Sequence, residues 1–92
     1  MKLTWDEKKR RVNLEKHGID FALAERIFGA FDVVDIPDTR YDYGEERHLV
    51  YATVNEKKMC MCYVVREEEI RVISIRGVHD REWRKHYGDE IL

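Results

Sequence analysis

Residues 59–65, with the sequence MCMCYVV, form an uninterrupted apolar run in the second half of the chain. The run is too short to cross a membrane as a helix, which takes about 20 residues. It is typical of a strand whose side chains alternate between two covered faces of a sheet. We therefore predict that this run is a central strand.

Further strand patterns lie on both sides of this run. Residues 47–54 alternate between two faces, and residues 70–76 are rich in β-branched side chains. Short polar turns join these strands to the central one, which favours an antiparallel meander. Residues 33–36 predict a short additional strand, and the proline that follows them confines its end to an edge or a loop.

Helix signals flank the strand region. Asp6 is a good N-cap and Gly18 a good C-cap for a first helix. A second helix is expected from Asp20 to Gly29, where apolar residues recur at near-helical spacing, and a last helix over 81–87. This order predicts an α+β fold. It has two N-terminal helices, an antiparallel meander of three to four strands and a C-terminal helix, with the helices on one sheet face.

Composition limits the classes of function. At 92 residues, 1–92 is expected to be a single domain. Charged residues make up 39% of the chain but leave a net charge of −2, so nucleic-acid binding would require cations segregated onto one face. The charged N-terminus lacks a signal-peptide core, and no apolar stretch has membrane-spanning length. We expect a cytoplasmic protein, with no membrane contact and both cysteines as thiols.

The two cysteines, Cys60 and Cys62, share one face of the predicted central strand. A zinc site would need further ligands, such as His48 or His79, and the spacing fits no common zinc pattern. Buried core residues are the favoured interpretation, because free cysteine is among the most buried residue types. We expect no metal and no cofactor, and a metal-binding protein is the weakest of the alternatives.

The four histidines are scattered along the sequence. His17 precedes the C-cap glycine, where a cation complements the helix dipole. His79 follows the third meander strand directly before the last helix, a position from which side chains point into a site. Orienting or capping roles are expected for His48 and His86.

Arg71 and Arg76 lie on the third meander strand and, by parity, on opposite faces. Arg76 is at the strand end, close to Arg81 and Arg84 of the last helix, and such a group is able to form a phosphate fork. The competing interpretation is a solvated Arg76 paired with an acidic neighbour such as Glu82.

A run of four cations, 8–11, lies in the first helix. One helical turn spreads four side chains around the axis, so they cannot all contact one ligand. A second stripe shows ordinary charge pairing and consists of Lys8, Arg11 and Glu15. The stripe at i, i+4 and i+7 is therefore the candidate for function, and it consists of Lys9, Asn13 and Lys16.

Taken in order, these motifs resemble the BrnT toxin family over about residues 3–87. The family belongs to type II toxin–antitoxin modules, and the resemblance implies a compact fold similar to the RelE and ParE toxins. The matching residues are Trp5, Asp6, Lys9, Asn13, Lys16, His17, Gly18, Phe21, Ala24, Phe28, Asp38, Arg40, the Tyr-Gly-Glu-Glu-Arg run at 43–47, the Arg-Val-Ile-Ser-Ile-Arg run at 71–76, Arg84 and Tyr87.

The resemblance implies a ribonuclease toxin that suppresses translation and needs no metal. It also implies RNA as substrate and a BrnA-type ribbon-helix-helix antitoxin as partner, with DNA contacted only through that antitoxin. In such chemistry the RNA 2′-OH attacks the adjacent phosphate. The site then needs a proton acceptor, cations for the charged phosphorane and an acid for the leaving oxygen.

The resemblance also assigns site residues. Arg76 and Arg47 are expected at the phosphate, and Lys9 or His17 in proton transfer or charge stabilisation. Tyr87 is expected to stack on a base or donate a proton. Further RNA contacts are expected from Asn13, Lys16, Arg81 and Arg84.

Residues 77–83, Gly-Val-His-Asp-Arg-Glu-Trp, depart from the family pattern, which commonly continues with alanine, a small hydroxyl residue and a strongly basic helix start. This departure implies either that His79 takes over proton transfer or that RNA contact is weakened. The alternative function is a non-catalytic RelE-like module that binds a partner and acts only in a repressor complex. The general base, the RNA target, ribosome dependence and the oligomeric state stay open.

Overall fold

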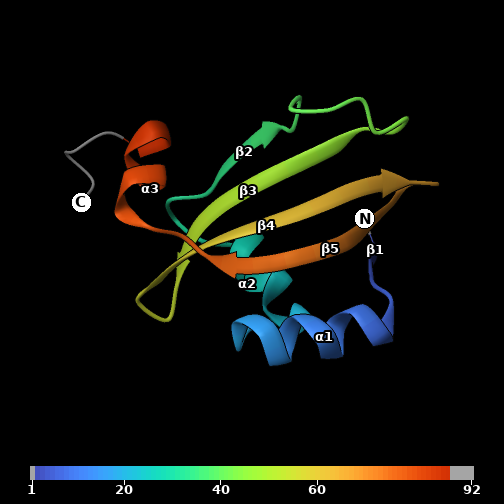
Figure 1. Cartoon of the computed structure of the whole chain (residues 1–92), viewed down its shortest axis with the longest axis horizontal. Helices are drawn as coiled ribbons and strands as arrows, with labels where there is room; N and C mark the ends of the chain where they lie inside the picture. Colours follow the sequence, from blue (N-terminus) through green and yellow to red (C-terminus); the bar gives the residue numbers. More distant parts are fainter. Residues whose placement is uncertain (1, 88–92) are drawn as a thin grey trace.

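Five strands, three α-helices and one 3₁₀ turn make up the part of the chain that the computed structural model describes, residues 2–87 (Figure 1). The predicted α+β class is confirmed. In chain order the elements are β1 (Lys2–Thr4), α1 (Glu7–His17), η1 (Phe21–Leu23), α2 (Ala24–Phe28), β2 (Val34–Pro37), β3 (Arg47–Val54), β4 (Lys57–Arg66), β5 (Glu69–Gly77) and α3 (Asp80–Tyr87).

The strands form one mixed sheet in the order β1-β5-β4-β3-β2. β3, β4 and β5 pair antiparallel, so the predicted meander is confirmed, and β4, which holds the apolar run, is the central strand. β2 pairs antiparallel with β3 at one edge. β1 pairs parallel with β5 at the other edge and is a fifth strand beyond the predicted three to four.

Helix α1 begins and ends where its caps predict. The Asp6 side chain accepts a hydrogen bond from the backbone N–H of Lys9 at 3.0 Å. Gly18 has a φ of 71°, and its N–H donates to the Leu14 carbonyl. A residue with a Cβ atom is strained in this left-handed backbone conformation, whereas glycine adopts it without strain. Local chemistry therefore sets both ends of α1.

The prediction of one continuous second helix over 20–29 is wrong. Asp20 accepts a hydrogen bond from the Ala22 N–H at 2.9 Å, and the next three residues form the 3₁₀ helix η1. Only five residues, those of α2, are then α-helical. Phe21 of η1 and Ala24 and Ile27 of α2 recur every three residues, and all three are buried. A spacing of three residues occurs in both helix types, so it did not reveal the change from a 3₁₀ turn to an α-helix.

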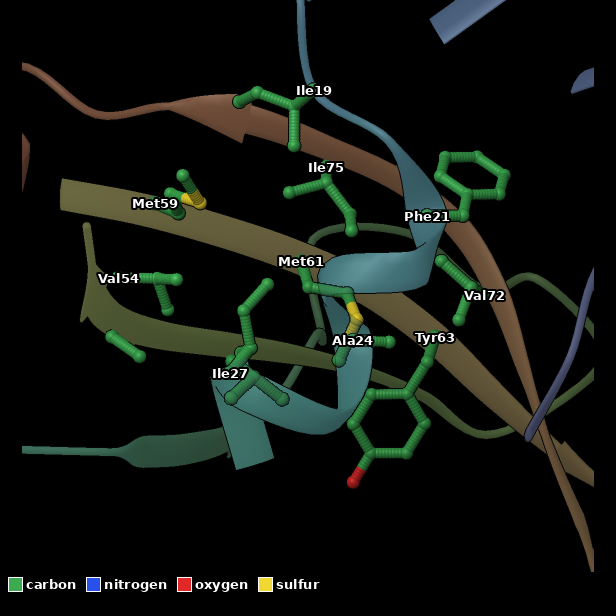
Figure 2. Packing of buried hydrophobic residues seen from close by; sticks show 12 residues of the cluster. Ile19, Phe21, Ala24, Ile27, Val54, Met59, Met61, Tyr63, Val72 and Ile75 are labelled. Carbon is green, nitrogen blue, oxygen red and sulfur yellow. The ribbon is translucent and has the colours of Figure 1, made fainter. Parts of the chain in front are cut away.

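The main hydrophobic core lies between the sheet and the η1–α2 segment (Figure 2). Ile27 of α2, Met61 of β4 and Ile75 of β5 are completely buried in it. Each such side chain contributes roughly 1.5–3 kcal/mol relative to leaving it in water. We call the sheet face that carries this core the α2 face.

Helix α3 confirms the predicted C-terminal helix but packs on the opposite face of the sheet. Trp83 is only 1% exposed and lies in a second cluster with Tyr51 and Cys60. These two strand residues alternate with core residues, so they point away from the α2 face. The prediction that the helices lie on one sheet face is therefore wrong, because α3 covers part of the other.

A β-bulge interrupts the pairing of β4 with β5. Cys62 pairs with Ser74, but the next residue, Tyr63, pairs with Val72. Ile73 is therefore an extra residue in β5. Side chains on the two sides of the bulge no longer follow simple alternation.

The bulge decides which face each β5 arginine occupies. Val72 and Ile75 both lie in the main core although they are three residues apart. Arg76 pairs with Cys60, and Arg71 pairs with Val64, so both arginines lie on the face away from that core. The parity prediction of opposite faces for Arg71 and Arg76 is wrong, because strict alternation requires an uninterrupted ladder.

Helix α1 runs along the edge of β5, beyond the point where β1 ends (Figure 1). The Asn13 amide nitrogen donates to the Ile75 carbonyl at 2.9 Å, and the amide oxygen accepts from the Ile75 N–H at 3.2 Å. The same nitrogen donates to the Ile19 carbonyl at 3.0 Å. One side chain thus satisfies backbone groups that a further strand would otherwise pair.

Candidate functional site

The sheet face on which α3 packs carries four arginine side chains, two from β5. We call it the α3 face. α3 covers the end of it where β5 ends (Figure 1). Cross-strand partners share a face, so the α3 face includes Arg47, Leu49, Tyr51, Cys60, Cys62, Val64, Arg66, Arg71, Ser74 and Arg76.

A hollow of about 580 Å³ lies between α3, this face and the segment after β2. We call it the α3 hollow. It brings together three of the predicted site residues, Arg76, His79 and Arg81. Cations and histidines that the sequence did not single out also line it, namely Arg40, Lys85 and His86.

Arg76 is held by an acidic residue of α3. Its two terminal nitrogens donate to the Glu82 carboxylate at 2.9 and 2.8 Å, and the Tyr51 hydroxyl donates to the same carboxylate at 2.6 Å. The Arg76 hydrogen bonds lower the pKa of Glu82 to about 2, and the Tyr51 hydroxyl acts in the same direction. The ion-pair interpretation of Arg76 is thus correct in geometry, and an incoming anion has to compete with Glu82 for this fork.

The segment after β2 is fixed by its own side chains. Asp38 is 7% exposed, and its carboxylate accepts from Arg40 at 2.8 and 2.9 Å and from the Tyr43 hydroxyl at 3.3 Å. The Arg40 hydrogen bonds lower the pKa of Asp38 to about 2. The Asp38 N–H also donates to the Arg47 carbonyl at 2.8 Å. These contacts hold Arg40 at the rim of the α3 hollow.

Arg47 lies at the opposite end of the α3 face from α3. Its guanidinium stands 4.1 Å from the centre of the Tyr43 ring. Its Nε is buried and, among residues 2–87, has no hydrogen-bond partner. The aromatic contact fixes the plane of the guanidinium while leaving its charge without a carboxylate partner in the described part of the chain.

A second hollow of about 420 Å³ lies between α1 and the bulged part of β5. We call it the α1 hollow. It brings together Lys9, Lys16 and His17 with Ser74. Ser74 and Arg76 are two residues apart on the same face of β5, and one lines each hollow. The two hollows are therefore neighbours along β5.

Four predicted site residues are not placed as expected. Arg47 was expected at one phosphate with Arg76, but it lines neither hollow and lies toward the other end of the α3 face. Asn13 is 6% exposed and its amide is taken up by backbone groups, so it binds α1 to β5. The Tyr87 hydroxyl donates to the Tyr51 carbonyl at 2.7 Å, and its ring stacks on Trp83 with centroids 3.9 Å apart. Arg84 lies exposed on α3 but does not line the α3 hollow.

Glu82 and His86, like Arg40 and Lys85, lie at this site although the sequence did not assign them to function. His86 packs against the Tyr51 ring, with centroids 4.2 Å apart, at the α3 hollow. Glu82 and His86 lie on α3 at i and i+4, a spacing that puts them on one helix face. This spacing can be read from the sequence, but only the position of α3 on the sheet shows that this face of the helix meets Arg76.

Other classes of site find little support in the described residues. Cys60 and Cys62 are buried free thiols, and burial raises the pKa of Cys60 to about 11. Within residues 2–87, no three potential metal ligands of the His, Cys, Asp and Glu types are grouped. No helix in that range is both long and apolar enough to cross a membrane.

Comparison with known proteins identifies the family. No curated protein matches the chain. A family model described as the ribonuclease toxin BrnT of type II toxin–antitoxin systems matches residues 5–82, which takes in α1, the whole sheet from β2 to β5 and the start of α3. The chain therefore belongs to the BrnT family of ribonuclease toxins of type II toxin–antitoxin systems.

Proposed function

We propose that the chain is a metal-independent endoribonuclease that cuts RNA on its α3 face and thereby inhibits translation in the cytoplasm. The main supporting observation is that Ser74 and Arg76 stand between two neighbouring hollows lined by cations and histidines. In a chain of net charge −2, this is the segregation of cations that nucleic-acid binding requires. The two carboxylates that line the α3 hollow, Asp38 and Glu82, are each paired with an arginine. We further propose that residues 1–92 form a single RelE-like domain.

The proposed reaction is an internal transesterification. The RNA 2′-oxygen forms a bond to the adjacent phosphorus, the bond from phosphorus to the 5′-oxygen breaks, and a 2′,3′-cyclic phosphate remains. One group accepts the 2′-OH proton and another donates a proton to the leaving 5′-oxygen. Cationic side chains stabilise the charge of the phosphorane, which is the role that a metal ion plays in other nucleases.

We assign Arg76 to the phosphate that is cut. A guanidinium fork that binds a carboxylate through two hydrogen bonds also fits two phosphate oxygens, so RNA would take the place of Glu82. Among the predicted groups, His79 lines the same hollow and is the first candidate for proton transfer. Lys9 and His17 line the α1 hollow and are the second candidates.

RNA contacts are proposed for Lys16 and Arg81, which line the α1 and α3 hollows, and for Arg84 on the exposed side of α3. Tyr87 and Asn13 are left out of the proposed site, because hydrogen bonds to backbone carbonyls engage both side chains. We therefore predict that substitutions of Lys16, Arg81 and Arg84 change activity, whereas substitutions of Tyr87 and Asn13 change stability.

A type II toxin is neutralised by a protein antitoxin, and membership of this family implies such a partner. We propose a BrnA-type ribbon-helix-helix antitoxin, with DNA contacted only through it. The partner is tested by co-expressing the chain with the product of an adjacent small reading frame. Recovery of a stable complex that restores growth supports the proposal, and an adjacent frame of another protein class argues against it.

The alternative is a non-catalytic module that binds its partner and acts only in a repressor complex. One observation favours it: the Arg76 fork is already filled by Glu82. If that ion pair is purely structural, Glu82→Ala and Arg76→Ala should reduce stability and toxicity to the same extent. If Arg76 serves the phosphate, only Arg76→Ala abolishes function.

Toxicity in cells tests the proposed function. Expression of the chain without an antitoxin should arrest growth and fragment cellular RNA, and Arg76→Ala should abolish both effects while antitoxin binding remains. Purified protein should cut RNA equally well with and without EDTA. Normal growth with intact RNA would overturn the ribonuclease proposal, and loss of cutting in EDTA would overturn metal independence.

A further inference from the structure

The four arginines of the α3 face fall into two groups. In the first group a carboxylate holds each guanidinium: Glu45 holds Arg66 at 2.9 and 3.0 Å, and Glu82 holds Arg76 at 2.9 and 2.8 Å. Arg47 and Arg71 differ, because within residues 2–87 neither has a carboxylate at ion-pair distance. Both lie on the α3 face. Among the arginines of this face, these are the two whose charge no carboxylate of residues 2–87 neutralises at ion-pair distance.

Register places these two arginines on either side of one residue. Arg47 of β3 and Arg71 of β5 both pair with Val64 of the central strand. Neighbouring strands are about 4.8 Å apart, so the two Cα atoms lie about 10 Å apart across the sheet. Two arginine side chains rising from one face at this separation are able to contact the same phosphate.

Lys9 contributes a third cation at this end of the sheet. Its charge helps to lower the pKa of Glu45, after Arg66 and Arg47, and helps to lower the pKa of Asp6, a carboxyl that also faces Arg71. Lys9 is therefore within electrostatic reach of both carboxylates that border the Arg47–Arg71 pair. Those carboxylates already accept hydrogen bonds, Asp6 at the α1 N-cap and Glu45 from Arg66.

This group is separate from Arg76. Arg71 and Arg76 are five residues apart on β5, which is about 15 Å of strand even with the bulge. Arg76 lies at the α3 end of the face, and Arg71 lies where β5 pairs with β1. Without the bulge, Arg71 would be turned toward the α2 face and no second cationic group would exist.

We infer that Arg71, together with Arg47, forms a second phosphate-binding subsite for single-stranded RNA, one or more nucleotides away from the phosphate that is cut. Lys9 of the neighbouring α1 hollow adds positive charge to this subsite. This inference rests on the proposed ribonuclease function. It assigns RNA binding to the end of the α3 face that lies away from α3. Arg71 is a substrate-positioning residue here, so it acts on affinity rather than on the chemical step.

Binding to a 12-nucleotide single-stranded RNA with 2′-O-methyl groups, which cannot be cut, tests the subsite directly. Affinity is measured over a series of salt concentrations for the wild type, Arg71→Ala and Arg71→Lys. Arg26→Ala is the matched control, because Arg26 is an exposed arginine on α2 at the opposite side of the sheet. Unfolding midpoints show that each variant is folded.

We expect Arg71→Ala to bind about tenfold more weakly and to reduce the slope of log affinity against log salt by about 0.7. Arg71→Lys should keep most of the slope, and Arg26→Ala should match the wild type. Replacing single phosphates by neutral methylphosphonates should show one position at which the loss caused by Arg71→Ala disappears. A folded Arg71→Ala variant that binds like Arg26→Ala would overturn the subsite.

Cleavage separates this inference from the proposed function. With an RNA of the same length that carries free 2′-OH groups, Arg71→Ala should raise KM and leave kcat unchanged. With a dinucleotide, which is too short to reach the subsite, the substitution should change neither KM nor kcat. A wild type that cuts RNA, with Arg71→Ala equal to Arg26→Ala, rejects the subsite alone. A wild type that neither cuts nor binds RNA rejects the ribonuclease proposal and the subsite together.

Discussion

Asn13 lies in the same helical stripe as Lys9 and Lys16, yet it is 6% exposed whereas the two lysines are exposed. The difference follows from where α1 lies. The stripe faces the edge of β5, and the short Asn13 amide reaches the Ile75 backbone there, while the longer lysines extend past it to line the α1 hollow. The same stripe thus has a structural centre between two exposed cations.

Replacing Asn13 by alanine should destabilise the fold without touching the α3 face. The variant leaves buried backbone groups of Ile75 and Ile19 unpaired, at a cost of about 2–3 kcal/mol in the free energy of unfolding. Glu15→Ala, at an exposed position of the same helix, should change it by less than about 0.5 kcal/mol. Urea unfolding measures both, and equal effects would contradict the edge-pairing role.

Glu82 should make stability depend on pH in the acid range. Its pKa is about 2 in the folded protein, against an ordinary value of 4.5. A carboxyl with a lowered pKa stabilises the fold above pH 4.5, and this contribution is lost as pH falls from about 4.5 toward about 2. Asp38, whose pKa is also about 2, adds to the same loss.

Thermal unfolding between pH 6 and pH 2.5 measures this contribution. Glu82→Gln should be less stable than the wild type near pH 6, and the difference should shrink as the pH falls. Glu25→Gln, at an exposed position on α2, serves as the control and should follow the wild-type curve. A gap between Glu82→Gln and the wild type that stays constant with pH would contradict the assignment.

Among the elements, α3 is joined to the sheet chiefly through side chains. Trp83 is 1% exposed, the Tyr87 hydroxyl donates to a β3 carbonyl, and Lys58 donates to Asp80 at 2.7 Å. These contacts hold Glu82 against Arg76. The position of α3 therefore determines both the shape of the α3 hollow and what occupies the Arg76 fork.

Trp83→Ala should release α3 from the sheet. Truncating a buried tryptophan costs about 3–5 kcal/mol when the surroundings do not collapse, and less if α3 detaches by itself. We expect amide hydrogen exchange to rise first in α3, with β3, β4 and β5 still protected. Arg81→Ala, an exposed substitution on the same helix, should leave exchange unchanged. Uniform loss of protection in Trp83→Ala would show that α3 is not a separate unit.

Elements whose signals are local could be predicted from the sequence. The two ends of α1 follow from Asp6 and Gly18, and the central strand follows from its apolar run. The prediction of one continuous second helix was wrong because burial every three residues fits a 3₁₀ turn followed by a short α-helix as well as it fits a single α-helix. Periodicity alone does not separate these two cases over ten residues.

Features that depend on distant contacts could not be predicted. The bulge at Ile73 contains no glycine that would indicate it in the sequence, and it is defined only by the pairing of β5 with β4. Arg71 was therefore assigned to the wrong face of the sheet. The side of the sheet that α3 covers likewise depends on Trp83 meeting Tyr51 and Cys60. The positions of Arg76 and His79 at one hollow agree with their selection from the sequence, and their roles stay predictions.

For the whole molecule, the decisive quantity is the distribution of charge rather than its sum. Many of the cations and anions that give 39% charged residues form pairs, such as Arg10 with Asp20 and Arg66 with Glu45. Such exposed or half-exposed pairs contribute little to stability and neutralise each other for a distant ligand. The unpaired cations on the α3 face then decide where an anion binds.

The central claim is that Arg76 stabilises the phosphate that is cut and is not merely the ion-pair partner of Glu82. The most direct measurement is cleavage of a short defined RNA by purified wild type, Arg76→Ala and Glu82→Ala, with the new 3′ end identified by mass spectrometry. We predict a 2′,3′-cyclic phosphate with the wild type, a loss of about 10²-fold or more in kcat with Arg76→Ala, and retained cleavage with Glu82→Ala. Equal losses in the two folded variants, or a wild type that leaves the RNA intact, would contradict the account.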